Sequence, residues 1–79
     1  MTAKEMFIDL GYECTQDDEN YITYVRHLAN SGFKYTISFY KKYLDILIYS
    51  TRYDRPVTGV CLDKNTLKAI NQKIKELDV

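Results

Sequence analysis

The sequence has few of the residues from which metal and redox sites are built. Its 79 residues include two cysteines, Cys14 and Cys61, and a single histidine, His27. A structural zinc ion needs about four ligands, so these three side chains cannot hold one on their own. The cysteines also lack Cys-x-x-Cys spacing, and nothing else points to an oxidising compartment. We therefore expect two free thiols, buried or partly buried, and no disulfide.

Long apolar runs and an excess of charge of one sign are also missing. No apolar stretch approaches the ~18 residues of a transmembrane helix. The beginning of the chain, MTAKEMFIDLG, has neither the basic start nor the apolar core of a signal peptide. We therefore expect a cytoplasmic protein with no membrane contact. The formal net charge is zero, which argues against a dedicated duplex-DNA binder, because phosphate contacts supply most of the affinity of such proteins.

The charges are unevenly distributed along the chain. Residues 1–19 contain one lysine against six acidic residues, a balance of −5, whereas residues 20–60 contain six basic residues against two acidic ones, a balance of +4. An acidic start and a basic middle can steer a charged partner, although a solvated surface is the commoner reason for such a pattern.

Motifs for catalysis and for calcium binding are absent. His27 would need Cys14 or Cys61 beside it in space to form a nucleophilic pair, and neither cysteine stands in a glycine-rich nucleophile turn. The acidic residues 17–19 lack the twelve-residue spacing of an EF-hand, so we interpret them as part of a solvated loop. The sequence predicts a protein that is not an enzyme and has no metal or cofactor.

Helix boundaries are the clearest positive signals. Thr2 and Glu5 have capping-box spacing, and Gly11 stands where a left-handed residue would end a helix, so we predict a helix from about Ala3 to Leu10.

A second helix is predicted over about Lys64 to Leu77. Asp63 is a suitable N-cap for it. Apolar residues repeat along it at helical spacing, and they are Leu67, Ile70, Ile74 and Leu77.

Three strands are predicted between the helices. YITYVRHL starts at Tyr21, FKYTISFY starts at Phe33, and LDILIYST starts at Leu44. Their content of β-branched and aromatic residues, and the strict alternation of the second segment, are typical of half-buried strands. We interpret TQDDEN, residues 15–20, as a loop, and RYDRPVTGV as a loop that can include a short edge strand at Val57 to Cys61.

The hydrophobic pattern also predicts a register for the second hairpin. With a four-residue connection around YKKY, Phe39 lies opposite Leu44, Ile37 opposite Ile46 and Tyr35 opposite Ile48, all on one face.

The predicted fold is a single α+β domain over residues 1–79. Its order is α-β-β-β-α, with a three-stranded antiparallel meander that a short fourth strand can extend, and both helices on one face. Two short helices can cover only one side of such a sheet, so the other side is left to solvent or to a partner.

Tyrosine is the unusual component, with eight tyrosines and no tryptophan. Alternation assigns Tyr35 to the core-facing side, and we expect Tyr24 to join Ile22 there. The opposite side is the candidate partner-binding face, and its members are Val25, Tyr40, Tyr43, Leu47 and Tyr49.

Two functions from different classes fit these features. The leading hypothesis is a non-enzymatic interaction protein, either a homodimer or a protein bound to a bacterial or phage partner. The alternative is a single-stranded nucleic-acid binder in which tyrosines of that face stack on bases. Its phosphate contacts would be Arg26, Lys34, Lys41, Lys42, Arg52 and Arg55.

The two ends of the chain carry a resemblance. TAKEMFIDLGYE at Thr2 to Glu13 and LKAINQKIKEL at Leu67 to Leu77 frame an aromatic strand region. In this combination the chain resembles small uncharacterised proteins encoded by phages and prophages of Gram-positive bacteria. The resemblance implies an α-β-β-β-α arrangement and a bacterial cytoplasmic setting, and it implies no catalytic residues.

Overall fold

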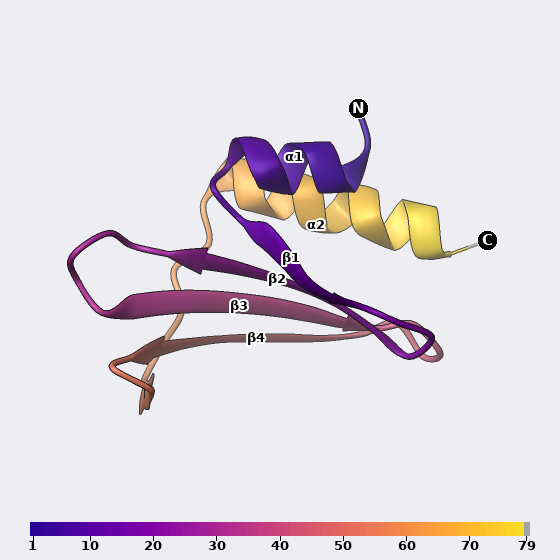
Figure 1. Ribbon diagram of the computed structural model, residues 1–79. Helices are drawn as coiled ribbons and strands as arrows, with labels where there is room; N and C mark the ends of the chain where they lie inside the picture. Colours follow the sequence, from indigo (N-terminus) through magenta and orange to yellow (C-terminus); the bar gives the residue numbers. More distant parts are fainter. Residues whose placement is uncertain (79) are drawn as a thin grey trace.

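The computed structural model describes residues 1–78 as one antiparallel sheet covered by two helices. The elements are α1 (Ala3–Asp9), β1 (Glu13–Asp17), β2 (Tyr21–His27), β3 (Phe33–Tyr40), β4 (Asp45–Arg52), β5 (Arg55–Val57) and α2 (Lys64–Leu77). The strands pair in chain order, β1-β2-β3-β4-β5. Both helices lie on the same side of the sheet (Figure 1). The α+β class is therefore confirmed.

The sheet has more strands than the sequence predicts, because both edges are extended by polar segments. β1 includes residues 15–17, which we expected to be part of a loop, and all five of its side chains are exposed. A bulge between Cys14 and Gln16 interrupts its pairing with β2, so no alternation of apolar residues marks it as a strand. At the other edge, β5 lies at Arg55–Val57 and not at Val57 to Cys61. Pro56 is tolerated there because an edge strand leaves part of its backbone without a ladder partner.

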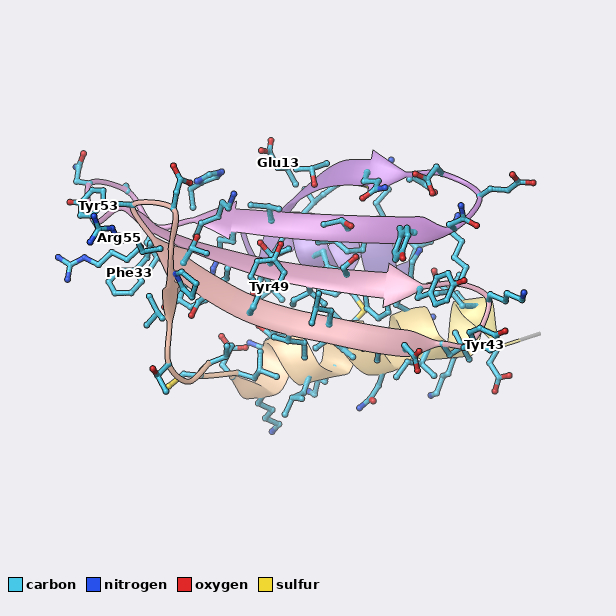
Figure 2. All side chains as sticks on the ribbon, turned by 90° about the horizontal axis from the view of Figure 1, so that it is seen from below. Glu13, Phe33, Tyr43, Tyr49, Tyr53 and Arg55 are labelled. Carbon is cyan, nitrogen blue, oxygen red and sulfur yellow. The ribbon has the colours of Figure 1, made fainter. Side chains whose placement is uncertain are left out.

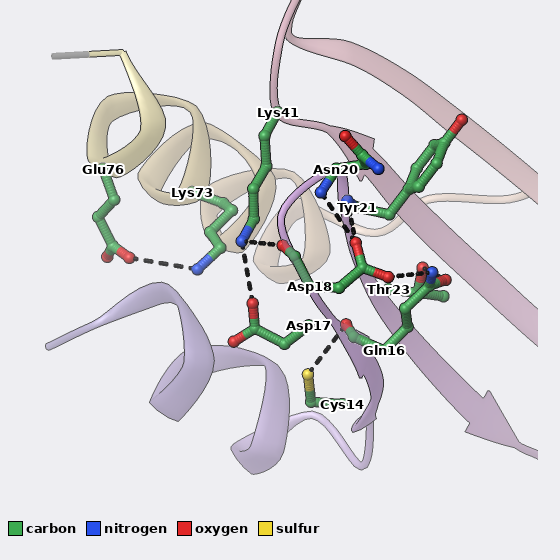
Figure 3. A network of polar contacts seen from close by, with 10 residues as sticks. All are labelled: Cys14, Gln16, Asp17, Asp18, Asn20, Tyr21, Thr23, Lys41, Lys73 and Glu76. Atoms are coloured by element: carbon green, nitrogen blue, oxygen red, sulfur yellow. Dashed lines mark hydrogen bonds and ion pairs between the residues drawn. The ribbon is translucent and has the colours of Figure 1, made fainter.

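The turn between β1 and β2 is built on one aspartate. Asp18 Oδ1 accepts hydrogen bonds from the backbone N–H groups of Asn20 at 2.9 Å and Tyr21 at 2.8 Å. Gln16 Nε2 donates to Asp18 Oδ2 at 2.8 Å (Figure 3). The bond from Gln16 and the two backbone bonds stabilise the carboxylate, so they lower the pKa of Asp18.

Helix ends fall where the capping residues predict them. Thr2 and Glu5 form a complete capping box at the start of α1, and Gly11 beyond its end has a φ of 91°. Asp63 caps α2 by accepting from the Thr66 N–H at 2.7 Å. The predicted bounds of α2 are confirmed, and α1 ends one residue earlier than predicted, with Leu10 as its C-cap.

Aromatic rings form the centre of the core, between the sheet and the helices. Phe7 from α1 stacks on Tyr24 from β2 with ring centroids 4.2 Å apart, and Phe39 meets both rings edge to face. Ala69 and Ile70 bring α2 into the same cluster. Burial raises the pKa of Tyr24 to about 12. The expected core position of Tyr24 is confirmed, and the partly buried Tyr35 packs against the cluster as well.

The predicted register of β3 and β4 is wrong by two residues. Phe39 pairs with Ile46, Ile37 with Ile48, and Tyr35 with Ser50. The connection uses residues 41–44, and Leu44 leaves the strand because it adopts a left-handed φ of 56°. A shift of two residues keeps each side chain on the same face of a strand. Ile46 and Ile48 therefore still face the core.

Candidate functional site

The sheet has one face that neither helix covers, and we call it the outer face. Its middle is formed by two pairs across β3 and β4, Ser38 with Leu47 and Thr36 with Tyr49. Leu47 is 60% exposed and Tyr49 is 41% exposed, so two large side chains of β4 project into solvent from the middle of the sheet. Figure 2 shows the sheet from the side opposite the helices, with Tyr49 near its centre.

The other predicted members of this face are less accessible or lie off the strands. Val25 is on the outer face, opposite Thr36 on β3 and Glu13 on β1. It is only 7% exposed, because β1 lies beside it. The three-stranded sheet expected from the sequence did not include this strand. Tyr40 is half-buried, and Tyr43 lies in the turn between β3 and β4. Val25 therefore contributes little surface to a partner.

A cluster of three tyrosines occupies one end of the outer face. Tyr21 and Tyr40 are cross-strand partners whose rings stack at 5.1 Å, and Tyr43 meets Tyr40 edge to face at 5.6 Å. Tyr21 and Tyr40 also line a shallow hollow of about 310 Å³ that reaches Leu47. Sequence reasoning missed Tyr21, although its spacing of two residues from Thr23 assigns it to this face.

The middle of the outer face holds small hydroxyl side chains beside Leu47 and Tyr49, and none of its side chains is charged. Thr23 and Ser38 face each other across β2 and β3, and their hydroxyl oxygens are 2.9 Å apart. Thr36 is buried, and its hydroxyl has no hydrogen-bond partner among residues 1–78. The charged side chains of this face lie around these residues, and they are Glu13 on β1, Lys34 on β3 and Asp45 on β4. An uncharged centre inside a charged margin is the composition of a protein interface.

The six predicted phosphate contacts do not form one track. Lys41 and Lys42 are in the turn beside Tyr43, whereas Arg52 and Arg55 flank the turn between β4 and β5. Figure 2 shows Tyr43 and Arg55 at opposite ends of the sheet, and the molecule is 38 Å long. Lys34 is on the outer face, opposite Thr51 on β4.

Two of these basic side chains, Lys41 and Arg26, already donate hydrogen bonds within the described part of the protein. Lys41 Nζ lies 3.0 Å from Asp17 Oδ1 and 2.6 Å from the Asp18 carbonyl oxygen (Figure 3). Arg26 is on the helix-covered face, where its guanidinium lies over the rings of Tyr12 at 5.0 Å and Tyr35 at 5.3 Å. Lys41 is held by its two hydrogen bonds, and Arg26 faces the helices, so neither side chain can follow a strand of nucleic acid across the outer face.

The two thiols differ from the expectation. Cys14 and Cys61 are both free, and both are exposed, not buried. Cys14 lies on the edge strand β1 and Cys61 in the segment before α2, so neither reaches the core. In residues 1–78 no group of three or more His, Cys, Asp or Glu side chains is placed to hold a metal ion. Neither helix there is long and apolar enough to cross a membrane.

No protein-family model, curated protein or solved structure matches this chain. The resemblance to phage and prophage proteins therefore stays a prediction.

Proposed function

We propose that this chain is a non-enzymatic interaction protein that pairs with a second copy of itself through the outer face. The observation that carries the proposal is the exposure of Leu47 and Tyr49 in the uncharged middle of the outer face. Burial of such apolar surface is the main favourable term in protein association. The charged margin of the face supplies the polar rim that interfaces have.

A second copy fits this face better than a strongly charged partner does. The chain has no formal net charge, so two copies do not repel one another over distance. The margin holds both signs, with Glu13 and Asp45 against Lys34, and it can therefore complement itself. Five strands about 4.8 Å apart and up to eight residues long offer on the order of 500 Å² per copy. This area is at the low end for specific interfaces, so the expected dimer is weak and depends on concentration.

The setting that we propose for this role is the bacterial cytoplasm, as a phage- or prophage-derived protein. Its support is the resemblance of the two helical ends to such proteins. A heterologous protein partner at the same face is the competing occupant, and the experiment below separates the two.

Sedimentation velocity over a range of protein concentrations tests the proposal with a matched pair of variants. Leu47→Lys places a charge in the middle of the outer face, and Leu67→Lys places the same charge on α2, where the leucine is 46% exposed. Interface centres tolerate an unpaired charge poorly. We expect wild type and Leu67→Lys to dimerise as concentration rises, and Leu47→Lys to stay a folded monomer by circular dichroism. A monomeric wild type at all concentrations would contradict self-association and leave the heterologous partner.

A further inference from the structure

The turn between β4 and β5 holds an exposed aromatic ring in an unusual backbone conformation. Tyr53 and Asp54 form this two-residue turn with φ values of 51° and 63°, a region that bulky side chains rarely adopt. Tyr53 is kept there by Gly32: its N–H donates to the Gly32 carbonyl at 3.0 Å, and its ring covers the glycine. A Cβ on Gly32 would overlap with that ring. Tyr53 is nevertheless 68% exposed, so much of its side chain faces solvent.

Two arginines flank this ring and lack a counter-ion. Arg52 and Arg55 are direct cross-strand partners, and like charges in such positions are destabilising. Within residues 1–78 neither guanidinium forms an ion pair or a hydrogen bond, with Asp54 or with any other group. Arg52 instead lies over the rings of Phe33 at 5.2 Å and Tyr53 at 5.6 Å. A bound anion would offset the repulsion between these two guanidinium groups, because no carboxylate in the described chain does so.

Space for a ligand lies at the same place. An open hollow of about 600 Å³ is lined by Arg52, Tyr53, Arg55, Pro56 and Val57. Guanidinium groups recognise phosphate through paired hydrogen bonds, and an exposed tyrosine ring stacks on a flat base. The hollow combines both groups within one six-residue hairpin, at the end of the sheet away from Tyr43 (Figure 2).

From this geometry we infer that the Arg52–Val57 hairpin binds a nucleotide unit, with Arg52 and Arg55 on the phosphate and Tyr53 stacked on the base. The site is separate from the middle of the outer face and does not depend on self-association. It uses two of the six basic residues expected from the sequence and none of the outer-face tyrosines.

Fluorescence anisotropy with a labelled thymidine oligonucleotide of about ten nucleotides tests the site at low salt. Arg52→Gln and Arg55→Gln should each weaken binding about tenfold. Lys42→Gln removes one charge at the opposite end of the sheet and should change the affinity less than about twofold. Absence of binding by wild type, or equal losses for Lys42→Gln and the arginine variants, would overturn the inference.

Competitors separate the phosphate from the base. If the ligand is a free nucleotide, thymidine monophosphate should displace the labelled strand. If the ligand is a nucleic-acid strand, only the unlabelled strand should displace it. Tripolyphosphate carries charge without a ring. Tyr53→Ser should therefore lower the affinity for the oligonucleotide and leave competition by tripolyphosphate unchanged. If Tyr53→Ser binds the oligonucleotide as tightly as wild type does, the hairpin binds anions in general, and the inference is overturned.

Arg55→Gln should not lower the melting temperature of the protein, because it removes a repulsive pair. A marked fall would contradict the premise that Arg52 and Arg55 repel one another.

Discussion

Two threonine hydroxyl groups on the outer face differ in their hydrogen bonding. Thr23 and Thr36 are both buried there, at 8% and 4% exposed. The Thr23 hydroxyl bonds with Ser38, whereas the Thr36 hydroxyl has no partner among the described residues. A buried polar group without a partner costs its desolvation energy and gains nothing in return.

This difference gives a prediction for two isosteric substitutions. Thr36→Val removes an unpaired hydroxyl and should leave the free energy of unfolding unchanged or raise it by up to about 1 kcal/mol. Thr23→Val breaks a hydrogen bond and strands the Ser38 hydroxyl, so it should lower that free energy by about 1 kcal/mol. Urea denaturation at one protein concentration measures both. Equal losses in the two variants would show that the Thr36 hydroxyl is paired in solution.

Among the secondary structure elements, α2 depends on a charged cap. Asp63 accepts a hydrogen bond from the Thr66 N–H, which lowers the pKa of the carboxyl group below its usual value. A carboxyl group whose pKa is lower in the folded state stabilises the fold above its unfolded pKa. That contribution is lost as the pH falls through the folded-state value.

Substitution of the cap separates its hydrogen bond from its charge. At neutral pH, Asp63→Ala should lower the free energy of unfolding because it removes the cap, and Asp63→Asn should have little effect because asparagine caps equally well. On acidification below about pH 4, the stability of wild type should approach that of Asp63→Ala, while Asp63→Asn keeps its advantage. Denaturation curves at the two pH values measure this. A wild-type advantage over Asp63→Ala that does not shrink in acid would contradict the role of the carboxylate.

How well each element could be predicted follows from the kind of signal that it carries. The helices have caps in the sequence, and β2 to β4 alternate, so their existence and facing could be read directly. β1 is polar and bulged, and its pairing with β2 depends on the Asp18 turn, which no hydrophobic pattern reveals. Leu44 continues the alternation of β4 in sequence, yet its left-handed backbone places it in the turn. The observed register of β3 and β4 differs from the predicted one for that reason.

The candidate site shows the same limit. Alternation correctly assigned Leu47 and Tyr49 to the outer face, because facing requires only the period of the strand. Exposure depends on neighbouring strands, and the unexpected β1 is the reason that Val25 is buried. The Arg52 and Arg55 pair was also out of reach, since it needs the pairing of β4 with β5.

At the scale of the whole molecule, the asymmetry of the two faces is the feature that matters. All of the helical cover is on one side (Figure 1), and the other side presents Leu47 and Tyr49 without cover from the described chain. The two ends of the sheet also differ, with stacked tyrosines at one end and unpaired arginines at the other. These surfaces can serve different ligands without competing for the same residues.

The most direct test of the outer face as an interface is NMR spectroscopy of wild-type protein during dilution. We expect the methyl signals of Leu47 and the ring signals of Tyr49 to shift as the dimer dissociates, because a second copy covers them. The methyl signals of Leu67 on α2 should stay constant, although Leu67 is also exposed. Shifts confined to Leu67 and its helix, or no shift in either leucine over a range in which the mass changes, would contradict the account.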